Sequence, residues 1–563
     1  MSDKLVGATH IKQAPADKIP AHNIIRYKCD VNLRDLFDGE GHAIGGEAKI
    51  HDNGDGTYDL YSFDDVDFIA LHSDYTQTLN LNITDVNVIK GKTIKKLVDF
   101  DPNTGMPSFT LPSPNITKID FGKYDMENLE DLTYAFYYMA YGPGDLESCN
   151  FGGLKLSKMT DLSWLYNFFF KIEELDLSGI DWSNKEYITQ YPQAGPNTKL
   201  KRIIFGPSEM PKLKQISFLF NDMLALEYTD FFENRTLPVV TSAERLFDGF
   251  DFGAIDFDFS TFSSPKLTNF KKTFASCKNL DSFKFTDFTT LDDPITLNWT
   301  LQGSSIKNLD LSGIKLGSGY MGLRSSTNLE TFTFDGVDTD NMTTAFEMFL
   351  GCSALTSLDI RNLNTSNITN FGMFASDCVS LTDFKFDGVD FSHVTKMNDF
   401  ISKSPLTTID MTSIDVSSCK DLSGFFWKCK NAETIDISTW NTPEVENIRG
   451  LFYQCEKLTD IDITSLSFGK VTNANDLFGG CSELTSIDTT PLGNLQNDCN
   501  IQAMFEYCGK LKCITRLNTT DTNHHNPYIF NNCDSLEQPS GSDFDDITSD
   551  AGSDWTNPNS CPA

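Results

Sequence analysis

A short motif recurs through the second half of the chain: an aromatic residue, a Cys three positions later and a Leu three positions after that. The clearest copies are 274–280, 349–355 and 452–458. From Cys352 to Cys533, with Ser404 filling one place, seven steps span 181 residues, a mean period of about 26. Self-similarity at such a period is typical of a solenoid, in which each unit buries its apolar side against its neighbours. The chain is therefore expected to form a stack of coils.

Each repeat has two halves with different apolar spacing. Ahead of the Cys, apolar residues recur at i, i+3, i+6 and i+7, as in Val445, Ile448, Leu451 and Phe452. That is helical spacing, so this half is predicted to be a short helix. Behind the Cys comes Leu-x-x-Leu-Asp-Ile, as in 355–360, where apolar and polar residues alternate at the end. That alternation predicts a short strand.

A strand and a helix in every repeat predict an α/β solenoid, with a parallel sheet on one face and short helices on the opposite face. Weaker copies extend the series toward the N-terminus, so the solenoid is expected to span residues 114–536 in about 16 to 17 coils. At about 4.8 Å per strand, its sheet would be roughly 80 Å long.

The segment 364–374 (Asn-Thr-Ser-Asn-Ile-Thr-Asn-Phe-Gly-Met-Phe), with its flanking Leu-x-x-Leu-Asp strand and Phe-x-x-Cys-x-x-Leu turn, carries a family resemblance. It resembles the BspA-like leucine-rich repeat family of surface proteins. The resemblance is strong over 329–536, degenerate over 114–328 and absent from 1–113. Members of that family are mostly bacterial or protist surface proteins that bind host or matrix partners, and similar repeats occur in viruses and phages. The resemblance implies binding rather than catalysis.

The two ends of the chain lie outside the repeat. Residues 1–113 contain a hairpin signal, 49–51 and 58–61 around Asp-Asn-Gly-Asp-Gly at 52–56, and are interpreted as a small β-rich domain. This domain either caps the solenoid or docks it to something larger, such as other virion proteins. Residues 537–563 are rich in Ser, Gly and Asp and are interpreted as an acidic cap or tail.

Charge and hydropathy restrict the classes of partner. With 79 acidic and 45 basic residues, the formal net charge is −34, which would repel a phosphate backbone, so nucleic acid is not an expected partner. No run reaches the roughly 18 apolar residues of a membrane span, so membrane insertion is not expected. The expected partner is a protein or glycan receptor.

Eight cysteines occupy one equivalent place in the repeat. Neighbouring helices would hold equivalent positions about 8 to 10 Å apart, beyond the roughly 4.4 to 6.8 Å between Cα atoms that a disulfide tolerates. They are therefore predicted to be buried, reduced structural thiols: Cys277, Cys352, Cys378, Cys429, Cys455, Cys481, Cys508 and Cys533.

No catalytic, cofactor or metal site is predicted. The one Cys and His cluster, Cys508 and Cys513 with His524 and His525, lacks the close spacing of a metal site. The segment 52–56 has glycines where a calcium loop needs oxygen ligands, so it is interpreted as a turn. No Ser or Cys has a recognisable nucleophile motif around it, so the protein is expected not to be an enzyme.

One polar feature stands out from the repeat. The Asp of each Leu-x-x-Leu-Asp strand should point outward because the flanking apolar residues face the core. Either this column is an ordinary solvated face, or it is a strip that binds cations or a basic partner, because stacked carboxylates repel one another unless compensated. Its members are Asp359, Asp410, Asp436, Asp462 and Asp488.

Together these observations predict a non-enzymatic binding or adhesion protein. Residues 1–7 lead into a polar stretch without an apolar export segment, and the last ten residues have no hydrophobic tail. The leading hypothesis is therefore a virion (phage or virus) surface or receptor-recognition protein, attached through residues 1–113. The alternatives are a bacterial or protist cell-surface adhesin that binds host or matrix partners, and an intracellular scaffold.

Overall fold

A computed structural model describes most of the repeat region and parts of the N-terminal region. The described residues are 23–29, 40–44, 48–62, 68–70, 83–91, 98–100, 107–109, 116–120, 129–130, 147–151, 156–163, 172–190, 199–255, 257, 259–285, 293–495, 499–514 and 528–536. His524, His525 and the predicted C-terminal cap or tail (537–563) lie outside them. The chain divides into two compact units: unit 1 is Met1–Ser242 with Gly253–Pro265, and unit 2 is Ala243–Phe252 with Lys266–Ala563.

Unit 1 begins with an eight-stranded sheet of order β10-β9-β6-β1-β4-β3-β2-β5. The predicted hairpin is confirmed, because β3 and β4 pair antiparallel with Ile50 opposite Leu60 around the turn at 53–56. The strands of this sheet are β1 (Asn23–Cys29), β2 (Glu40–Ile44), β3 (Ala48–Asp52), β4 (Thr57–Ser62), β5 (Phe68–Ala70), β6 (Ile83–Gly91), β9 (Lys118–Asp120) and β10 (Ser148–Asn150). A separate pair joins β7 (Val98–Phe100) to β8 (Pro107–Phe109).

This sheet continues across residue 113, where the sequence predicts a domain boundary. Strand β6 pairs in parallel with β9, with Val86 opposite Ile119, and β9 pairs in parallel with β10. Strand β6 therefore supplies the hydrogen-bonding partner that the edge of β9 would otherwise lack, which is what a cap must do.

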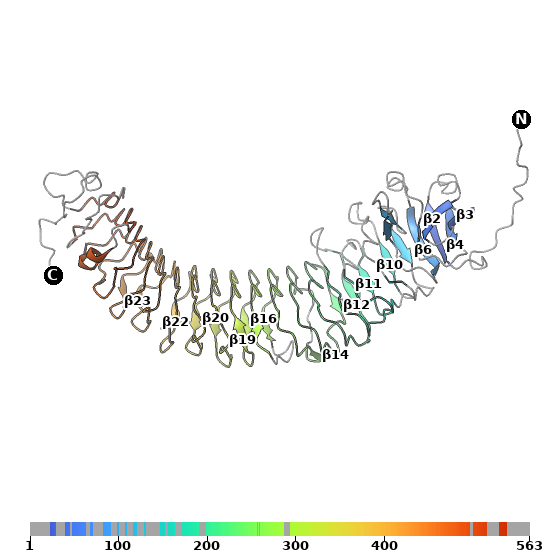
Figure 1. Cartoon of the computed structure of the whole chain (residues 1–563), viewed down its shortest axis with the longest axis horizontal. Coiled ribbons are helices and arrows are strands. Elements are labelled where there is room, and N and C mark those ends of the chain that lie inside the picture. Colours follow the sequence, from blue (N-terminus) through green and yellow to red (C-terminus); the bar gives the residue numbers. More distant parts are fainter. Residues whose placement is uncertain are drawn as a thin grey trace, which may run out of the picture. The chain divides into compact units, whose positions relative to one another are not determined.

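The repeats form a β-solenoid of short parallel strands (Figure 1), which pair in groups of two or three with strands of adjoining coils. In β20, β21 and β22, for example, Phe332, Leu358 and Phe384 are in register. The strands of the repeat are β11 (Glu174–Asp176), β12 (Arg202–Ile204), β13 (Tyr228–Thr229), β14 (Arg235–Thr236), β15 (Phe262–Ser263), β16 (Ser282–Lys284), β17 (Ile295–Thr296), β18 (Asn308–Asp310), β19 (Leu316–Ser318), β20 (Thr331–Thr333), β21 (Ser357–Asp359), β22 (Asp383–Lys385), β23 (Thr408–Asp410), β24 (Thr434–Asp436), β25 (Ser486–Ile487) and β26 (Cys513–Ile514).

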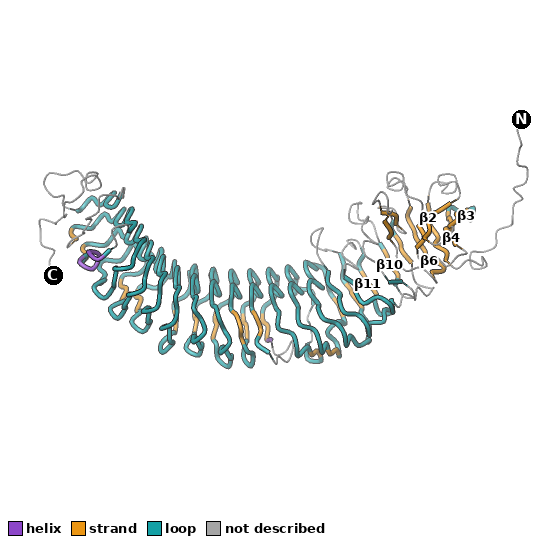
Figure 2. The backbone as a smooth tube through the Cα atoms, viewed as in Figure 1, coloured by secondary structure: helices purple, strands orange, loops and turns teal. Residues whose placement is uncertain are grey.

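The predicted helices are wrong. Figure 2 shows that the described coils consist of short strands and loops, with helix almost absent, and the short 3-10 helix η3 (Thr490–Asn494) lies outside the predicted positions. The half of each coil that precedes the Cys, here called the turn half, is a run of tight turns. In one coil Phe374 N–H donates to the Phe371 carbonyl at 3.2 Å, whereas Met373 N–H donates to Asn398 of the next coil at 2.7 Å.

Left-handed residues explain why the turn half is not helical. Two residues with positive φ, four apart, recur in successive coils, and a left-handed residue interrupts the i to i+4 ladder of a helix. Each non-glycine costs of order 1 kcal/mol, which a hydrogen bond of about 0.5–1.5 kcal/mol to the next coil can offset. The pairs are Phe218/Asp222, Arg245/Gly249, Lys272/Ser276, Trp299/Gly303, Met321/Ser325, Glu347/Gly351, Met373/Asp377, Asp399/Lys403, Gly424/Lys428, Gly450/Gln454, Asp476/Gly480, Ala503/Tyr507 and Tyr528/Asn532.

The residues predicted to face the core do face it, although they do so from turns. Val445, Ile448, Leu451 and Phe452 are all at most 3% exposed. Phe452 stacks on the Phe of the next coil with ring centroids 5.4 Å apart and planes only 3° from parallel. The same aromatic column runs through Phe426, Phe452, Phe478, Phe505 and Phe530 at centroid distances of 5.3 to 5.5 Å.

The repeat cysteines are buried free thiols, but the predicted separation of about 8 to 10 Å between neighbouring coils is wrong. Equivalent rings of neighbouring coils lie 5.3 to 5.5 Å apart, not 8 to 10 Å, because the coils stack as parallel strands do. Each of the eight thiols donates to a backbone carbonyl of the preceding coil, as Cys481 does to Phe452 at 3.1 Å. Burial raises the pKa of the Cys481 thiol to about 12. These cysteines form a polar ladder inside the core.

Candidate binding surface

The side chains of the predicted acidic column leave the strands on the exposed side. In β23 and β24 the first and third residues are exposed, and the central Ile409 and Ile435 are buried. The first and third residues of such strands therefore form an outward row of polar side chains, here called the strand face.

Each aspartate of the column also builds the turn that follows it. The carboxylate of Asp410 accepts hydrogen bonds from the backbone N–H of Thr412 at 3.0 Å and from its hydroxyl at 2.7 Å. A turn of this kind ends the strand because the carboxylate binds a backbone N–H that would otherwise pair with a neighbouring strand. The equivalent backbone bonds join Asp359 to Arg361, Asp436 to Ser438, Asp462 to Thr464 and Asp488 to Thr490.

These hydrogen bonds lower the pKa values of two of the aspartates. The hydroxyl of Thr412 lowers the pKa of Asp410, and the Arg361 guanidinium lowers the pKa of Asp359. Both carboxylates are consequently held in their charged form.

The structure brings together some members of the predicted column and not others. Asp410 and Asp436 are direct partners in the β23–β24 pair. Asp359 belongs to a different sheet, between Thr333 and Lys385. Asp462 lies outside any described strand, and Asp488 follows directly after β25.

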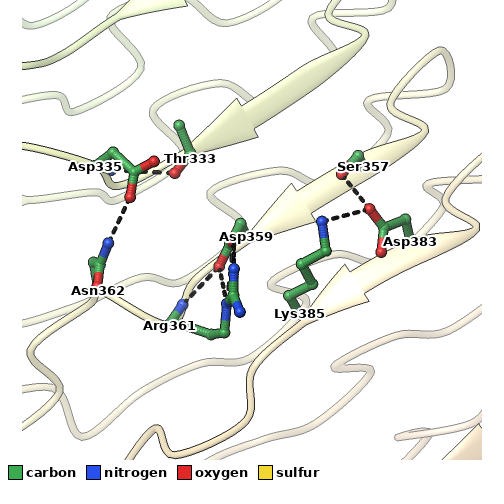
Figure 3. Close-up of polar contacts among 8 residues, drawn as sticks. All are labelled: Thr333, Asp335, Ser357, Asp359, Arg361, Asn362, Asp383 and Lys385. Carbon is green, nitrogen blue, oxygen red and sulfur yellow. Dashed lines mark hydrogen bonds and ion pairs between the residues drawn. The ribbon is translucent and has the colours of Figure 1, made fainter.

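The surroundings of Asp359 show how the strand face balances its charges (Figure 3). The guanidinium of Arg361 forms a fork with Asp359, with an Nη2 to Oδ2 distance of 2.6 Å. On the next strand Asp383 accepts from Ser357 at 2.8 Å and pairs with Lys385 at 2.8 Å. Around Asp359 the strand face is therefore locally neutralised.

Basic residues elsewhere are used mainly in ion pairs between successive coils. Lys430 pairs with Glu456 at 2.6 Å and Lys510 with Glu483 at 2.6 Å, in each case about 26 residues away. Within the described part of the chain, these pairs leave Asp410 and Asp436 without a cationic partner. The β23–β24 portion of the strand face is therefore an uncompensated acidic part of it.

The role of these aspartates in forming turns is not part of the prediction above, although the sequence carries a signal for it. A Ser or Thr stands two residues after Asp410, Asp436 and Asp462, which is the spacing of a side-chain turn. Two further corners of the same coil are built in this way, by Asp415 with Ser417 and by Asp421 with Ser423.

Among the described residues, no three or more His, Cys, Asp and Glu side chains are grouped so that they could hold a metal ion. No helix in the described part of the chain is long and apolar enough to cross a membrane.

Comparison with known proteins places the second half of the chain beside one family. Residues 300–406, 322–431, 373–490 and 420–544 match the family described as "Mycoplasma protein of unknown function, DUF285". These stretches overlap and together span 300–544, which is less than half of the 563 residues. No curated protein sequence matches the chain significantly.

Two solved structures resemble the fold. One is a leucine rich cell surface protein from Faecalibacterium prausnitzii A2-165, with 13% identity, 63% of this chain and 82% of that chain covered, and a TM-score of 0.23. The other is a leucine-rich-repeat protein from Leptospira interrogans, with 13% identity, 70% and 89% coverage, and a TM-score of 0.17. The repeat character of the chain rests on its own stacked coils, and the BspA-like resemblance remains a prediction.

Proposed function

We propose that the protein is a non-enzymatic binding or adhesion protein that presents its strand face to a protein or glycan receptor. The observation that supports this is the alternation of buried and exposed residues in strands such as β23 and β24. The central residue is buried in a stacked core, and its neighbours project outward at about 4.8 Å intervals on a backbone held by coil-to-coil hydrogen bonds. Such an extended, preorganised polar row suits a partner that contacts several coils at once.

Charge narrows the class of partner. The net charge of −34 and the uncompensated pair Asp410 and Asp436 favour a basic or cation-bridged partner and disfavour nucleic acid.

The virion surface is the location we propose, and the cell surface is the alternative. Fractionation decides between them: antibody labelling and mass spectrometry of gradient-purified particles and of washed cell envelopes from the source culture would show which one holds the protein. Recovery from the cytosol alone would contradict both locations and leave the intracellular scaffold.

The strand face can be tested with a charge change that preserves the fold. Replacing Asp410 and Asp436 by Asn removes two charges but keeps an oxygen that can accept the bond of each turn. The matched control replaces Asp390 and Asp415 by Asn, because these carboxylates make the same turn bond at another corner of the coil.

Binding of the purified full-length protein to intact receptor-bearing cells should fall for the strand-face variant and stay unchanged for the control. Equal binding by both variants would remove the β23–β24 part of the strand face from the function.

A further inference from the structure

A hollow of about 240 Å³ opens on unit 2, in the turn half of three consecutive coils. Its lining includes Tyr453, Glu456, Gly480, Ser482, Glu506 and Tyr507. These residues are separate from the strand face. Tyr507 is 58% exposed, one of the few large hydrophobic side chains that are this accessible among the described residues.

The hollow forms where a column of aromatic rings is interrupted. Trp427 stacks on Tyr453 of the next coil with centroids 4.1 Å apart, and both precede a left-handed residue of the repeat. The equivalent residue one coil later is Gly479, where a Cβ would lie only 3.2 Å from the Tyr453 ring. Glycine at 479 therefore leaves the next place in the column without a side chain, and the coil after it supplies Glu506.

The same protein shows what completes such an arrangement. Glu174, Arg202 and Tyr228 are in register on three consecutive coils. The Arg202 guanidinium is 3.1 Å from the Glu174 carboxylate and lies over the Tyr228 ring, 4.5 Å from its centroid. Here the order is carboxylate, guanidinium, aromatic ring.

At the hollow the ring and the carboxylate are present, and Gly479 between them has no side chain, although its backbone lies close to the Tyr453 ring. Tyr453 and Glu506 belong to coils two steps apart, which separates them by about 10 Å at roughly 4.8 Å per coil. A planar guanidinium is thin enough to lie between them, stacked on the ring and facing the carboxylate.

Charge at the hollow also favours a cation. The lining contains no Lys or Arg, and Glu456 is already paired with Lys430 at 2.6 Å. Glu506 accepts a hydrogen bond from the Asn531 amide at 2.8 Å, and no cation within the described ranges forms an ion pair with it. Burial, followed by the nearby carboxylates of Asp476 and Glu506, raises the pKa of Tyr453.

We propose that this hollow binds the guanidinium group of an arginine side chain presented by a protein partner. The inference rests on the proposed binding function and goes beyond it, because the hollow lies apart from the strand face and would bind a protein with an exposed arginine. Arginine is favoured over lysine because its flat group stacks on a ring while its N–H donors reach a carboxylate in the same plane.

The test uses the full-length protein and two fluorescein-labelled peptides that differ only in having two arginines or two citrullines. Citrulline has nearly the same shape and no charge. By fluorescence anisotropy, the arginine peptide should bind more tightly than the citrulline peptide. Glu506→Gln and Tyr453→Leu should each weaken it about two- to fivefold.

Glu483→Gln is the matched control because it removes the same charge in a neighbouring coil, where Glu483 pairs with Lys510 outside the lining. It should leave the affinity for the arginine peptide unchanged. Equal affinity for both peptides, or equal effects of Glu483→Gln and Glu506→Gln, would overturn the proposal. Binding of neutral glycans through Tyr453 without binding of the arginine peptide would also overturn the proposal.

The attachment assay separates this proposal from the proposed function. If the wild-type protein binds receptor-bearing cells but not the arginine peptide, the hollow is excluded and the function stands. If it binds no cell or particle at all, the proposed function fails whatever the peptides show.

Discussion

Replacing Asp436 by Asn or by Ala separates the two roles that the strand face gives this residue. Asp436 accepts the backbone N–H of Ser438 at 3.0 Å and lies beside Asp410 in the parallel pair. Both variants remove the charge, and only Asn keeps an oxygen acceptor. The difference in stability between the two variants therefore reports the hydrogen bond of the turn.

The magnitudes follow from these contacts. With the two carboxylates roughly 5 Å apart in water, their repulsion is about 0.8 kcal/mol, and physiological salt screens it to about 0.4 kcal/mol. The turn bond contributes about 0.5–1.5 kcal/mol. Asp436→Asn should therefore be as stable as the wild type or slightly more stable, and Asp436→Ala should be about 0.5–1.5 kcal/mol less stable than Asp436→Asn.

Amide hydrogen exchange measures this locally, which suits a long solenoid that need not unfold in one step. The Ser438 amide should exchange about two- to twelvefold faster in the Ala variant than in the Asn variant. The Asp415→Asn and Asp415→Ala pair is the control, because Asp415 makes the same turn bond to Ser417 at another corner of the coil. Equal exchange at Ser438 in both Asp436 variants would refute the structural role of this carboxylate.

Three further predictions concern the core and the turn half. Phe452→Ala removes a ring stacked on both sides and should destabilise the protein by about 3–5 kcal/mol in urea unfolding, whereas a loss below about 1 kcal/mol would show that the column contributes little. Gly450→Ala places a Cβ against the Trp427 ring at a φ of +57°. It should lower the stability of the protein by of order 1–3 kcal/mol and change its near-UV circular dichroism. An unchanged spectrum would contradict the stacking of Trp427 on Tyr453. Burial raises the pKa of Cys429 and Cys481 to about 12, so iodoacetamide at pH 8 should leave both unlabelled in the folded protein and label both in urea, as read by mass spectrometry; fast labelling of the folded protein would contradict their burial.

The candidate surface was predictable in part. The alternation of the strand residues correctly indicates that Asp410 and Asp436 face outward with Ile409 and Ile435 between them. It could not show that each carboxylate builds a turn or that Asp359 is paired with Arg361, because those contacts depend on the path of the chain after the strand. The hollow has no sequence signature, since it joins residues of three coils around the missing side chain of Gly479.

From the sequence alone the chain could be predicted to repeat about every 26 residues, to bury Val445, Ile448 and Phe452, and to form parallel strands such as β21 and β24 after a repeat cysteine. These features depend on apolar periodicity, which is local and visible in one repeat. The conformation of the turn half depends instead on contacts between coils. Its apolar spacing suits a helix and a run of turns equally well, and the choice is made by hydrogen bonds to the next coil, such as the bond from Met373 to Asn398, which keep left-handed residues in place. A single repeat contains no such partner, so its sequence could not reveal the outcome.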